Sequence, residues 1–370
     1  MFYPARMEQD GGISRLVTPR GRGAGRNMAG RFERERRAPV DDGWDIPEEP
    51  APLRTEISEE RPRSVIARND SPDIPFDRSL NPYRGCEHGC IYCYARPTHG
   101  YLGLSPGLDF ESRLVARPDA PQVLARQLSS PRYSPRPLAI GTVTDPYQPA
   151  EGERRITRAV LEVLRDFRHP ATIITRGTLI ERDLDLLGEM AAEGLVQVGV
   201  SVTTLDAGLA RRLEPRAPAP ARRLAMIGAL AGAGVPVQVM MAPVIPALTD
   251  HEVEALLQAA AEAGAGAASW VLLRLPHEVA PLFRDWLERH ASDRAERVMN
   301  RLREMHGGQD YDSGWGTRMR GQGVQADLLR RRFRLAARRH GLDRPLPPLD
   351  CSRFGRPPRA GDQLALFPDL

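Results

Sequence analysis

Three of the chain's four cysteines lie within eight residues, as Cys86-Glu-His-Gly-Cys90-Ile-Tyr-Cys93. Three thiolates on one short loop can each bind one iron of a cubane [4Fe–4S] cluster. The fourth iron then has no ligand from this loop and stays open to a small molecule. The spacing therefore predicts an iron–sulfur site with Cys86, Cys90 and Cys93 as its ligands.

Two other uses of these cysteines compete with that interpretation. A structural zinc site would add His88 or His99 to the three thiolates, but such sites usually pair two separated knuckles, and no second knuckle follows here. Buried structural thiols are scattered along a chain by packing, so three in one loop would be unusual. Cys351, far downstream, is by itself more often a small buried residue than a ligand.

The composition limits the compartment and the chemistry. The chain has no run of 18 apolar residues and no apolar stretch of a secretory signal at its start, so we expect neither a membrane span nor secretion. Four cysteines, three of them clustered, favour a reducing, cytoplasmic environment over a disulfide framework. All 52 basic residues are arginine, which excludes lysine chemistry such as a Schiff base or a Walker A loop.

The charge pattern divides the chain into four parts. Residues 1–70 are rich in arginine and glycine and then acidic and rich in proline, which predicts a disordered leader, either inert or in loose contact with nucleic acid. Residues 71–280 alternate between strand and helix patterns. Residues 281–350 predict a basic helical extension, and residues 351–370 an irregular tail.

The central part has the pattern of repeated β/α units. Strand onsets recur roughly every 25 to 40 residues, which is the length of a βαβ unit, and the strands are near-continuous apolar runs typical of a parallel sheet covered by helices. With a short strand before the cysteine loop, this predicts an α/β fold, a partial (β/α)6 barrel of TIM-like type. The predicted strands are Leu138–Val143, Ala171–Thr175, Val196–Thr203, Val235–Ala242 and Ser269–Leu275.

Helices are expected between these strands. The apolar spacing predicts helices over 151–167, 181–193 and 221–233. Thr249-Asp-His-Glu252 has the form of a capping box and predicts the start of a helix that runs to about Ala263.

The cysteine loop resembles the C-x3-C-x-Φ-C signature of the radical S-adenosylmethionine (SAM) superfamily, with Tyr92 in the aromatic position. The resemblance implies that the open iron chelates the amino and carboxylate groups of SAM. It also implies that an electron from the cluster, provided by a low-potential donor, splits SAM to a 5′-deoxyadenosyl radical. Chemistry in such folds lies at the C-terminal ends of the strands.

These strand ends carry the SAM contacts that the resemblance implies. Asp145 or Gln148, after the second strand, would accept from the SAM ammonium. Arg176 would hold the carboxylate bidentately, and Ser201 would reach the ribose or the carboxylate. The alternative is that Asp145 and the following proline only form a turn and that Glu151 only starts a helix.

Four segments are similar to one branch of this superfamily, the bacterial group of spore photoproduct lyase and "DNA repair photolyase" proteins. They are Asn81–Cys86, Cys90–Tyr94, Thr144–Pro149 and Leu213–Pro218. Spore photoproduct lyase splits a thymine dimer and uses a cysteine near the second strand as hydrogen donor. Residues 138–151 contain no cysteine here, so Tyr94 and Cys351 are the candidate donors.

A separate motif lies in the tail. The sequence Gln363-Leu364-Ala-Leu366-Phe367 resembles the peptide by which bacterial proteins dock on the replicative sliding clamp. Leu366 and Phe367 would fill an apolar pocket while Gln363 anchors the backbone. The alternative is that this apolar tail folds back on the barrel.

Together these features favour a radical SAM enzyme that abstracts hydrogen from DNA, with the processing of damage as the expected role. The clamp-like motif and the arginines around Arg330 make nucleic acid the leading substrate class, since a net charge of +4 would not decide it. One alternative is radical SAM modification of RNA or a peptide. Another is a non-catalytic adaptor that holds zinc or a cluster and bridges DNA to the clamp.

Overall fold

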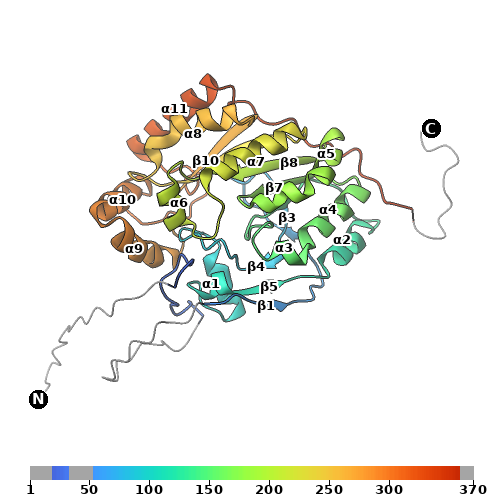
Figure 1. Cartoon of the computed structure of the whole chain (residues 1–370), viewed down its shortest axis with the longest axis horizontal. Helices are drawn as coiled ribbons and strands as arrows, with labels where there is room; N and C mark the ends of the chain where they lie inside the picture. Colours follow the sequence, from blue (N-terminus) through green and yellow to red (C-terminus); the bar gives the residue numbers. More distant parts are fainter. Residues whose placement is uncertain (1–18, 33–52, 359–370) are drawn as a thin grey trace, which may run out of the picture.

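The computed structural model describes residues 19–32 and 53–358, and its largest element is an open sheet of seven strands (Figure 1). The strands lie in the order β10-β9-β8-β7-β6-β3-β2. Six of them run parallel, and β2 (Ala67–Arg68) pairs antiparallel with β3 at one edge. The six parallel strands are β3 (Arg78–Leu80), β6 (Leu138–Ile140), β7 (Ala171–Thr175), β8 (Val196–Ser201), β9 (Val237–Val244) and β10 (Ala267–Leu272).

Five of these strands overlap the apolar runs of the sequence, and β3 is the short strand expected before the cysteine loop. All but one of the positions of β8 are buried, as expected for a central parallel strand with both faces covered. The α/β fold with a partial (β/α)6 barrel is confirmed, and β10 and β2 are its open edges. The helices along the sheet in Figure 1 are α4 (Ile156–Asp166), α5 (Leu184–Ala192), α7 (Pro220–Gly232) and α8 (Val253–Glu262).

A second, three-stranded sheet lies beside the main one and carries the cysteine loop (Figure 1). Its order is β1-β5-β4, where β1 (Glu56–Glu59) is parallel to β5 (Arg113–Ala116) and β4 (Tyr83–Arg84) is antiparallel to it. The cysteine loop leaves β4 and leads to the 3-10 helix η1 (Arg96–Leu102), α1 (Asp109–Ser112) and, after β5, α2 (Ala120–Leu128). The long connection from β3 to β6 therefore builds the platform under the loop.

The helix predicted over 151–167 is interrupted. Arg155 has a left-handed backbone with φ 51°, which separates α3 (Glu151–Arg154) from α4. The fully buried Glu151 carboxylate accepts hydrogen bonds from the backbone N–H of Thr157 at 3.0 and 3.1 Å. Glu151 thus caps α4, in line with the alternative that it serves a helix start. The helix predicted over 181–193 begins with the 3-10 helix η2 (Thr178–Asp183), which leads into α5.

The capping box predicted at Thr249 is wrong. The Thr249 hydroxyl accepts from the backbone N–H of Ile245 at 2.9 Å, and η3 (Asp250–Glu252) precedes α8. The Glu252 carboxylate accepts from the Thr204 hydroxyl at 2.6 Å and from the backbone N–H of Leu205. Thr249 and Glu252 thus accept from backbone and side-chain donors outside the helix start. These tertiary contacts replace the reciprocal hydrogen bonds that a capping box would make.

The prediction of a disordered leader over 1–70 is wrong for the parts that the structure describes. Ala24 is fully buried, and the backbone N–H groups of Gly23 and Ala24 donate to the Glu111 carboxylate at 2.8 and 2.9 Å. Residues 56–59 form β1. A segment with few apolar residues is ordered here because a buried carboxylate on α1 satisfies its backbone. Residues 1–18 and 33–52 lie outside the described part.

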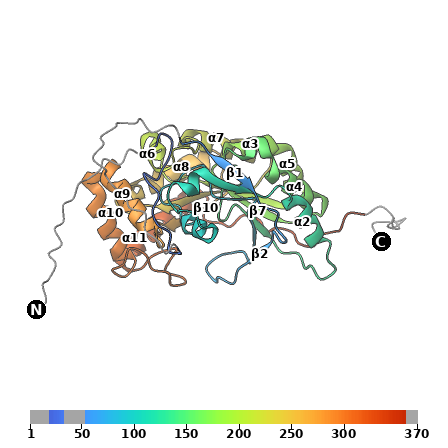
Figure 2. The ribbon, with the colours of Figure 1, turned by 90° about the horizontal axis from the view of Figure 1, so that it is seen from below.

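Three helices follow β10, in agreement with the predicted extension, and its excess of arginine lies mainly in the last of them. They are α9 (Val279–His290), α10 (Ser292–Met305) and α11 (Gly323–Arg339), and Figure 2 shows them gathered at one end of the molecule, away from α2 and α4. Phe333 of α11 packs near Trp270 of β10, with ring centroids 6.1 Å apart, so the extension covers this edge strand. Among the described residues, no helix has the length and apolar character that crossing a bilayer requires.

Candidate active site at the cysteine loop

The cysteine loop approaches α1 closely because two of its residues are glycine. Gly85 has φ +75°, and a Cβ there would lie 2.9 Å from the Phe110 carbonyl oxygen. Gly89 has φ +66°, and a Cβ there would lie 2.7 Å from a carboxylate oxygen of Glu111. The backbone N–H of Cys86 donates to the Phe110 carbonyl at 2.9 Å. Only glycine allows both the left-handed turns and the close packing.

The three thiols fit the chemistry of a metal cluster. Cys86 and Cys90 are buried, Cys93 is half-buried, and all three are free. Burial raises the pKa of Cys86 well above its usual value and that of Cys90 to about 12, although Arg176 opposes the second shift. Cys86 and Cys90 would therefore need a bound metal to become thiolates near neutral pH.

The histidines nearby are engaged elsewhere. The Nε2 atom of His99 lies 2.9 Å from the Arg113 carbonyl, and the Nδ1 atom of His88 lies 3.3 Å from the Asp145 carboxylate. Within residues 19–32 and 53–358, no three His, Cys, Asp or Glu side chains converge on a single ion position. In a cubane cluster each thiolate binds a different iron, so the cysteines need not converge in that way. The geometry gives no support to the zinc alternative.

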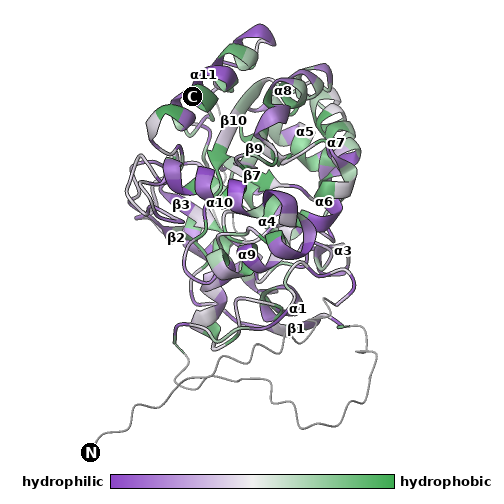
Figure 3. Cartoon of the chain, turned by 90° about the vertical axis from the view of Figure 1, so that its left-hand side faces the viewer, coloured by the Kyte–Doolittle hydropathy of each residue, from purple (hydrophilic) through white to green (hydrophobic). Residues whose placement is uncertain are grey.

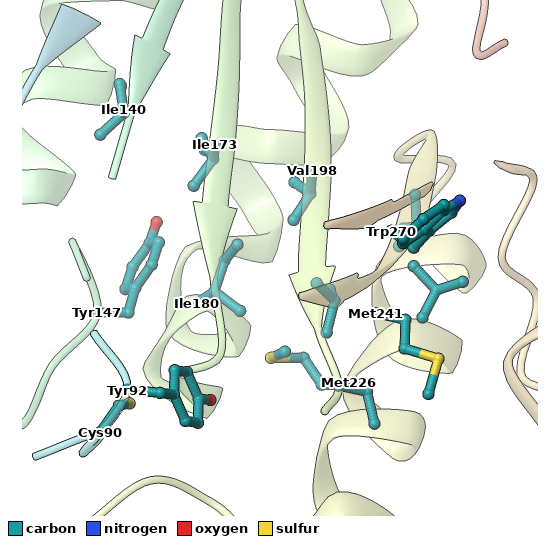
Figure 4. Close-up of a cluster of buried hydrophobic side chains, with 14 of the residues drawn as sticks. Cys90, Tyr92, Ile140, Tyr147, Ile173, Ile180, Val198, Met226, Met241 and Trp270 are labelled. Atoms are coloured by element: carbon teal, nitrogen blue, oxygen red, sulfur yellow. The ribbon is translucent and has the colours of Figure 1, made fainter. Parts of the chain in front are cut away.

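The loop faces the carboxyl ends of the central strands, where chemistry was expected. Figure 4 shows Cys90 and Tyr92 beyond the tip of β7. The backbone N–H of Ile91 donates to the carbonyl of Leu213 at 3.0 Å, which ties the loop to the end of α6 (Ala207–Leu213). Arg176 follows β7 directly, and Ser201 ends β8.

A buried charge network lies behind Cys90. Glu214 is 1% exposed, and its Oε1 atom accepts from Arg176 at 2.8 Å, from the Thr203 hydroxyl at 3.0 Å and from the Tyr92 hydroxyl. Its Oε2 atom accepts from Arg223. Burial alone would raise the pKa of Glu214, but Arg223 and Arg176 outweigh it and hold the pKa at about 2. Glu214 is therefore ionised between two arginines.

Arg176 carries this network to the thiol. Its Nη1 atom lies 3.1 Å from the Cys90 sulfur and 2.7 Å from the Tyr92 hydroxyl. Two guanidinium groups against one carboxylate leave one positive charge beside Cys90, which favours a thiolate there. The Tyr92 hydroxyl thus belongs to this network beside Cys90, and its predicted role at the cofactor stays a prediction. Glu214 was missed as a site residue, and its only signal was its place in the Leu213–Pro218 motif.

Asp145 has no free acceptor position in this structure. Its carboxylate accepts from the Thr175 hydroxyl at 2.6 Å and from the backbone N–H groups of Tyr147 and Arg176 at 2.9 and 2.8 Å, and it contacts His88. Burial would raise its pKa, but His88 and these hydrogen bonds hold it at about 2. The expected turn at Asp145 is present, and the side chain ties the loop after β6 to the end of β7.

Gln148 is also committed to the protein. It is fully buried, its Oε1 atom accepts from the backbone N–H of Glu87 at 2.9 Å, and its Nε2 atom donates to the Gly85 carbonyl at 3.2 Å. Both ends of the amide therefore hold the cysteine loop. The structure therefore gives Gln148 a supporting role in the loop, and its predicted contact with the SAM ammonium stays a prediction.

The remaining predicted residues separate into two places. Ser201 is buried at the network, where its carbonyl accepts from Arg223 at 3.2 Å. Tyr94 lies at the mouth of the site, 44% exposed, with the Arg274 guanidinium 4.7 Å from its ring centroid. Cys351 lies in a tail whose neighbouring backbone groups pair with Gly194 and Phe167, residues that precede β8 and β7. Cys351 therefore lies at the amino ends of the central strands, whereas the three thiols lie at their carboxyl ends. Its prediction as hydrogen donor is wrong.

The loop is supported from below by a second buried ion pair. Arg96 and Glu111 are both fully buried and paired with each other. Arg96 also donates to the carbonyls of Cys90 and Gly89 at 3.0 and 3.2 Å, while Glu111 accepts from the leader. Neither residue was predicted from the sequence, because nothing local indicates that they would be buried together.

Comparison with known proteins agrees with this geometry. Residues 80–260 match the family model of the radical SAM superfamily. An uncharacterized protein of Mycobacterium tuberculosis is 39% identical over 235 residues, which cover 63% of this chain and 68% of that protein. An uncharacterized protein of Methanocaldococcus jannaschii is 26% identical over 173 residues, 47% of this chain and 62% of that protein. The chain belongs to the radical SAM superfamily.

Solved structures share the fold. A cysteine-to-serine mutant of spore photoproduct lyase matches with a TM-score of 0.54 at 15% identity, over 78% of this chain and 80% of that chain. Spore photoproduct lyase complexed with dinucleoside spore photoproduct matches equally well. This protein is thus a radical SAM enzyme with the fold of spore photoproduct lyase, and enzymes of its family use a [4Fe–4S] cluster and SAM.

Proposed function

We propose that Cys86, Cys90 and Cys93 hold the cluster and that the enzyme abstracts hydrogen from DNA. The observation that carries the first part is the set of three free thiols at the carboxyl edge of the sheet, with Arg176 at 3.1 Å from Cys90. When bound, the cluster and SAM supply the radical that abstracts hydrogen. A low-potential electron donor in the cytoplasm would reduce the site.

The chain's own residues divide into those that position the loop and those that face SAM. Gln148, Asp145, Arg96 and Glu111 hold the loop and its neighbours through buried hydrogen bonds. Arg176 and Ser201 remain the candidates for SAM itself, since both lie at strand ends on the edge where the thiols lie. We assign residues 71–280 to the catalytic core and 281–350 to the extension.

The mouth of the site favours a nucleic-acid substrate. Tyr94, next to Cys93, is exposed beneath Arg274, and Arg274 also donates to the Tyr311 hydroxyl at 3.2 Å. Exposed aromatic rings and guanidinium planes are the surfaces on which unpaired bases stack. Spore photoproduct lyase, which has the same fold, has been captured with a dinucleoside lesion, and this motivates DNA as the first substrate to test.

The first test is anaerobic reconstitution with iron and sulfide, reduction in the presence of SAM, and an assay for 5′-deoxyadenosine. We expect product from the wild type and from Cys351→Ser, the matched control, and none from Cys86→Ser, Cys90→Ser or Cys93→Ser. A reconstituted cluster that never cleaves SAM would refute the proposed radical SAM activity and favour the alternative of a non-catalytic adaptor.

The substrate is tested separately. Damaged DNA with fully deuterated thymidines should transfer deuterium into 5′-deoxyadenosine if hydrogen is abstracted from a thymidine of the DNA. Transfer only from RNA or from peptides would replace DNA by the alternative substrates. Tyr94→Phe tests the remaining hydrogen-donor candidate, because abstraction should continue while return of hydrogen to the product stops.

A second proposal concerns the tail. We propose that Gln363, Leu364, Leu366 and Phe367 dock on the sliding clamp; these residues lie outside the described part, and the motif alone supports the proposal. A Leu366→Ala/Phe367→Ala double variant should lose binding to the purified clamp while its SAM cleavage stays unchanged. Equal clamp binding by both proteins would contradict docking.

A further inference from the structure

A cavity of about 480 Å3 lies apart from the cysteine loop, among η3, α10 and α11. Four arginines line it: Arg294, Arg297 and Arg301 from α10 and Arg332 from α11. Met305, Leu329, Pro246 and Ala247 add apolar lining, and Asp250 is the one acid among the described residues that line the cavity. In Figure 3, the ribbons of α10 and α11 include many residues coloured as hydrophilic.

The arrangement of the arginines follows from the helix. Arg294, Arg297 and Arg301 are spaced by three and four residues, so they share one face of α10. Val298 and Leu302, on another face, are fully buried and fix the helix against the protein. The three guanidinium groups are therefore held toward the cavity by the packing of α10.

The charges in the cavity are only weakly compensated. Arg332 is paired bidentately with Glu254, at 2.9 and 2.7 Å. Arg294 and Arg301 form exposed pairs with their own helix neighbours at 3.6 and 3.3 Å, which contribute little. Arg297 has no ion pair within the described part of the chain. Arg294 and Arg301 can thus exchange their weak partners for a bound anion, and Arg297 has no ion pair to break among the described residues.

The cavity lies at the same edge of the sheet as the cysteine loop. Pro246 follows the carboxyl end of β9, which is the neighbour of β8. The carbonyl of Met305 accepts from the backbone N–H of Gln322 at 2.9 Å, and Met319, three residues earlier, lies 3.5 Å from Arg274. Arg274 in turn covers Tyr94. A short stretch of chain therefore connects the cavity to the mouth of the site.

We propose that this cavity binds a backbone phosphate of the nucleic-acid strand whose reacting base enters at Tyr94. The inference rests on the proposed nucleic-acid substrate and names a binding site for it. Arginine guanidinium groups bind phosphate oxygens bidentately, and about 480 Å3 is enough for a phosphate and its sugar. The strand would be held at two points, by stacking at Tyr94 and by charge in the cavity.

The test uses the reconstituted holoenzyme with SAM and a fluorescent single-stranded oligonucleotide. An Arg297→Gln/Arg301→Gln variant should bind it about tenfold more weakly at low salt. The slope of log affinity against log salt should fall by about 0.7 for each phosphate that the variant no longer neutralises. SAM cleavage without substrate should stay unchanged, which shows that the variant is folded and loaded. The matched control is Arg331→Gln/Arg334→Gln, which removes two exposed charges of α11 that do not line the cavity.

The outcomes separate the two proposals. A weaker affinity and lower slope in the cavity variant, with a smaller effect in the control, would support the phosphate site. Equal losses in both variants, or no loss in either, would overturn it and leave a nucleic-acid substrate standing. Competition by a mononucleotide as strong as that by the oligonucleotide would overturn it in favour of a small-molecule site. A wild type that binds no oligonucleotide would refute both proposals.

Discussion

Glu111 offers the sharpest test of how the cysteine loop is held. Its carboxylate is fully buried, pairs with the fully buried Arg96 and accepts two backbone N–H groups of the leader, from Gly23 and Ala24. The substitution Glu111→Gln keeps the shape but removes the charge. It also places an amide NH2 against groups that are all donors.

The expected cost follows from the burial. Removing one partner of a buried ion pair leaves the other charge uncompensated, which costs about 3–5 kcal/mol. In a large domain 1 kcal/mol corresponds to about 2 °C in Tm, so the variant should melt about 6–10 °C below the wild type. Because Arg96 also binds the carbonyls of Cys90 and Gly89, its displacement should loosen the loop and lower the iron content after reconstitution.

The measurement is thermal unfolding with iron analysis on the same samples. Glu162→Gln is the matched control, since Glu162 forms a half-exposed pair with Arg158 at 3.3 Å on the surface of α4. Such a helix pair contributes about 0.3–0.5 kcal/mol, so the control should melt within about 1 °C of the wild type. If Glu111→Gln loses no more Tm than the control and binds as much iron, the argument from burial is wrong.

Three further predictions follow from other buried groups. His169 is fully buried, and burial lowers its pKa to about 4, so at pH values between about 4 and 6.5 the unfolded chain binds a proton that the folded chain does not. The free energy of unfolding should therefore fall by up to about 3 kcal/mol as the pH drops from about 6.5 to 4. His169→Gln should flatten this part of a Tm–pH profile. Glu214→Gln should cost about 3–5 kcal/mol in urea unfolding, since Arg176 and Arg223 lose their shared carboxylate; a loss no larger than that of Glu162→Gln would contradict it. Gln148→Leu leaves the Glu87 N–H and the Gly85 carbonyl without their partner, at a cost of about 1–3 kcal/mol each. The variant should retain less iron after reconstitution, because the lost hydrogen bonds lie in the cysteine loop. Unchanged iron binding would show that the loop does not depend on this amide.

The strands were predictable because a buried parallel strand has a sequence signal of its own. The apolar runs that form β7 and β8 are bounded by turn residues, and little in their surroundings can change that pattern. The break at Arg155 was not predictable, because the apolar spacing continues through it and the cause is the Glu151 carboxylate seated at the start of α4. The capping box at Thr249 failed for the same kind of reason.

In the site, too, local features were predictable from the sequence and tertiary contacts were not. The cysteine spacing is local, so Cys86, Cys90 and Cys93 could be chosen as candidates from the sequence alone. The position of Asp145 and Gln148 near the loop was also predictable from the strand ends. Their partners were not, because backbone groups of the cysteine loop and of Arg176 compete with any ligand for these side chains, and that competition exists only after folding.

The leader shows why such support comes from polar groups. The loop buries Ile91, but its turns are fixed by hydrogen bonds to its backbone carbonyls and N–H groups. Arg96 supplies the donors, and burying that charge requires Glu111. Glu111 then has acceptor capacity left over, and the glycines of the leader bring the N–H groups of Gly23 and Ala24 close enough to use it. The ordering of residues 19–32 is therefore a consequence of how the cysteine loop is held, and the two should be lost together.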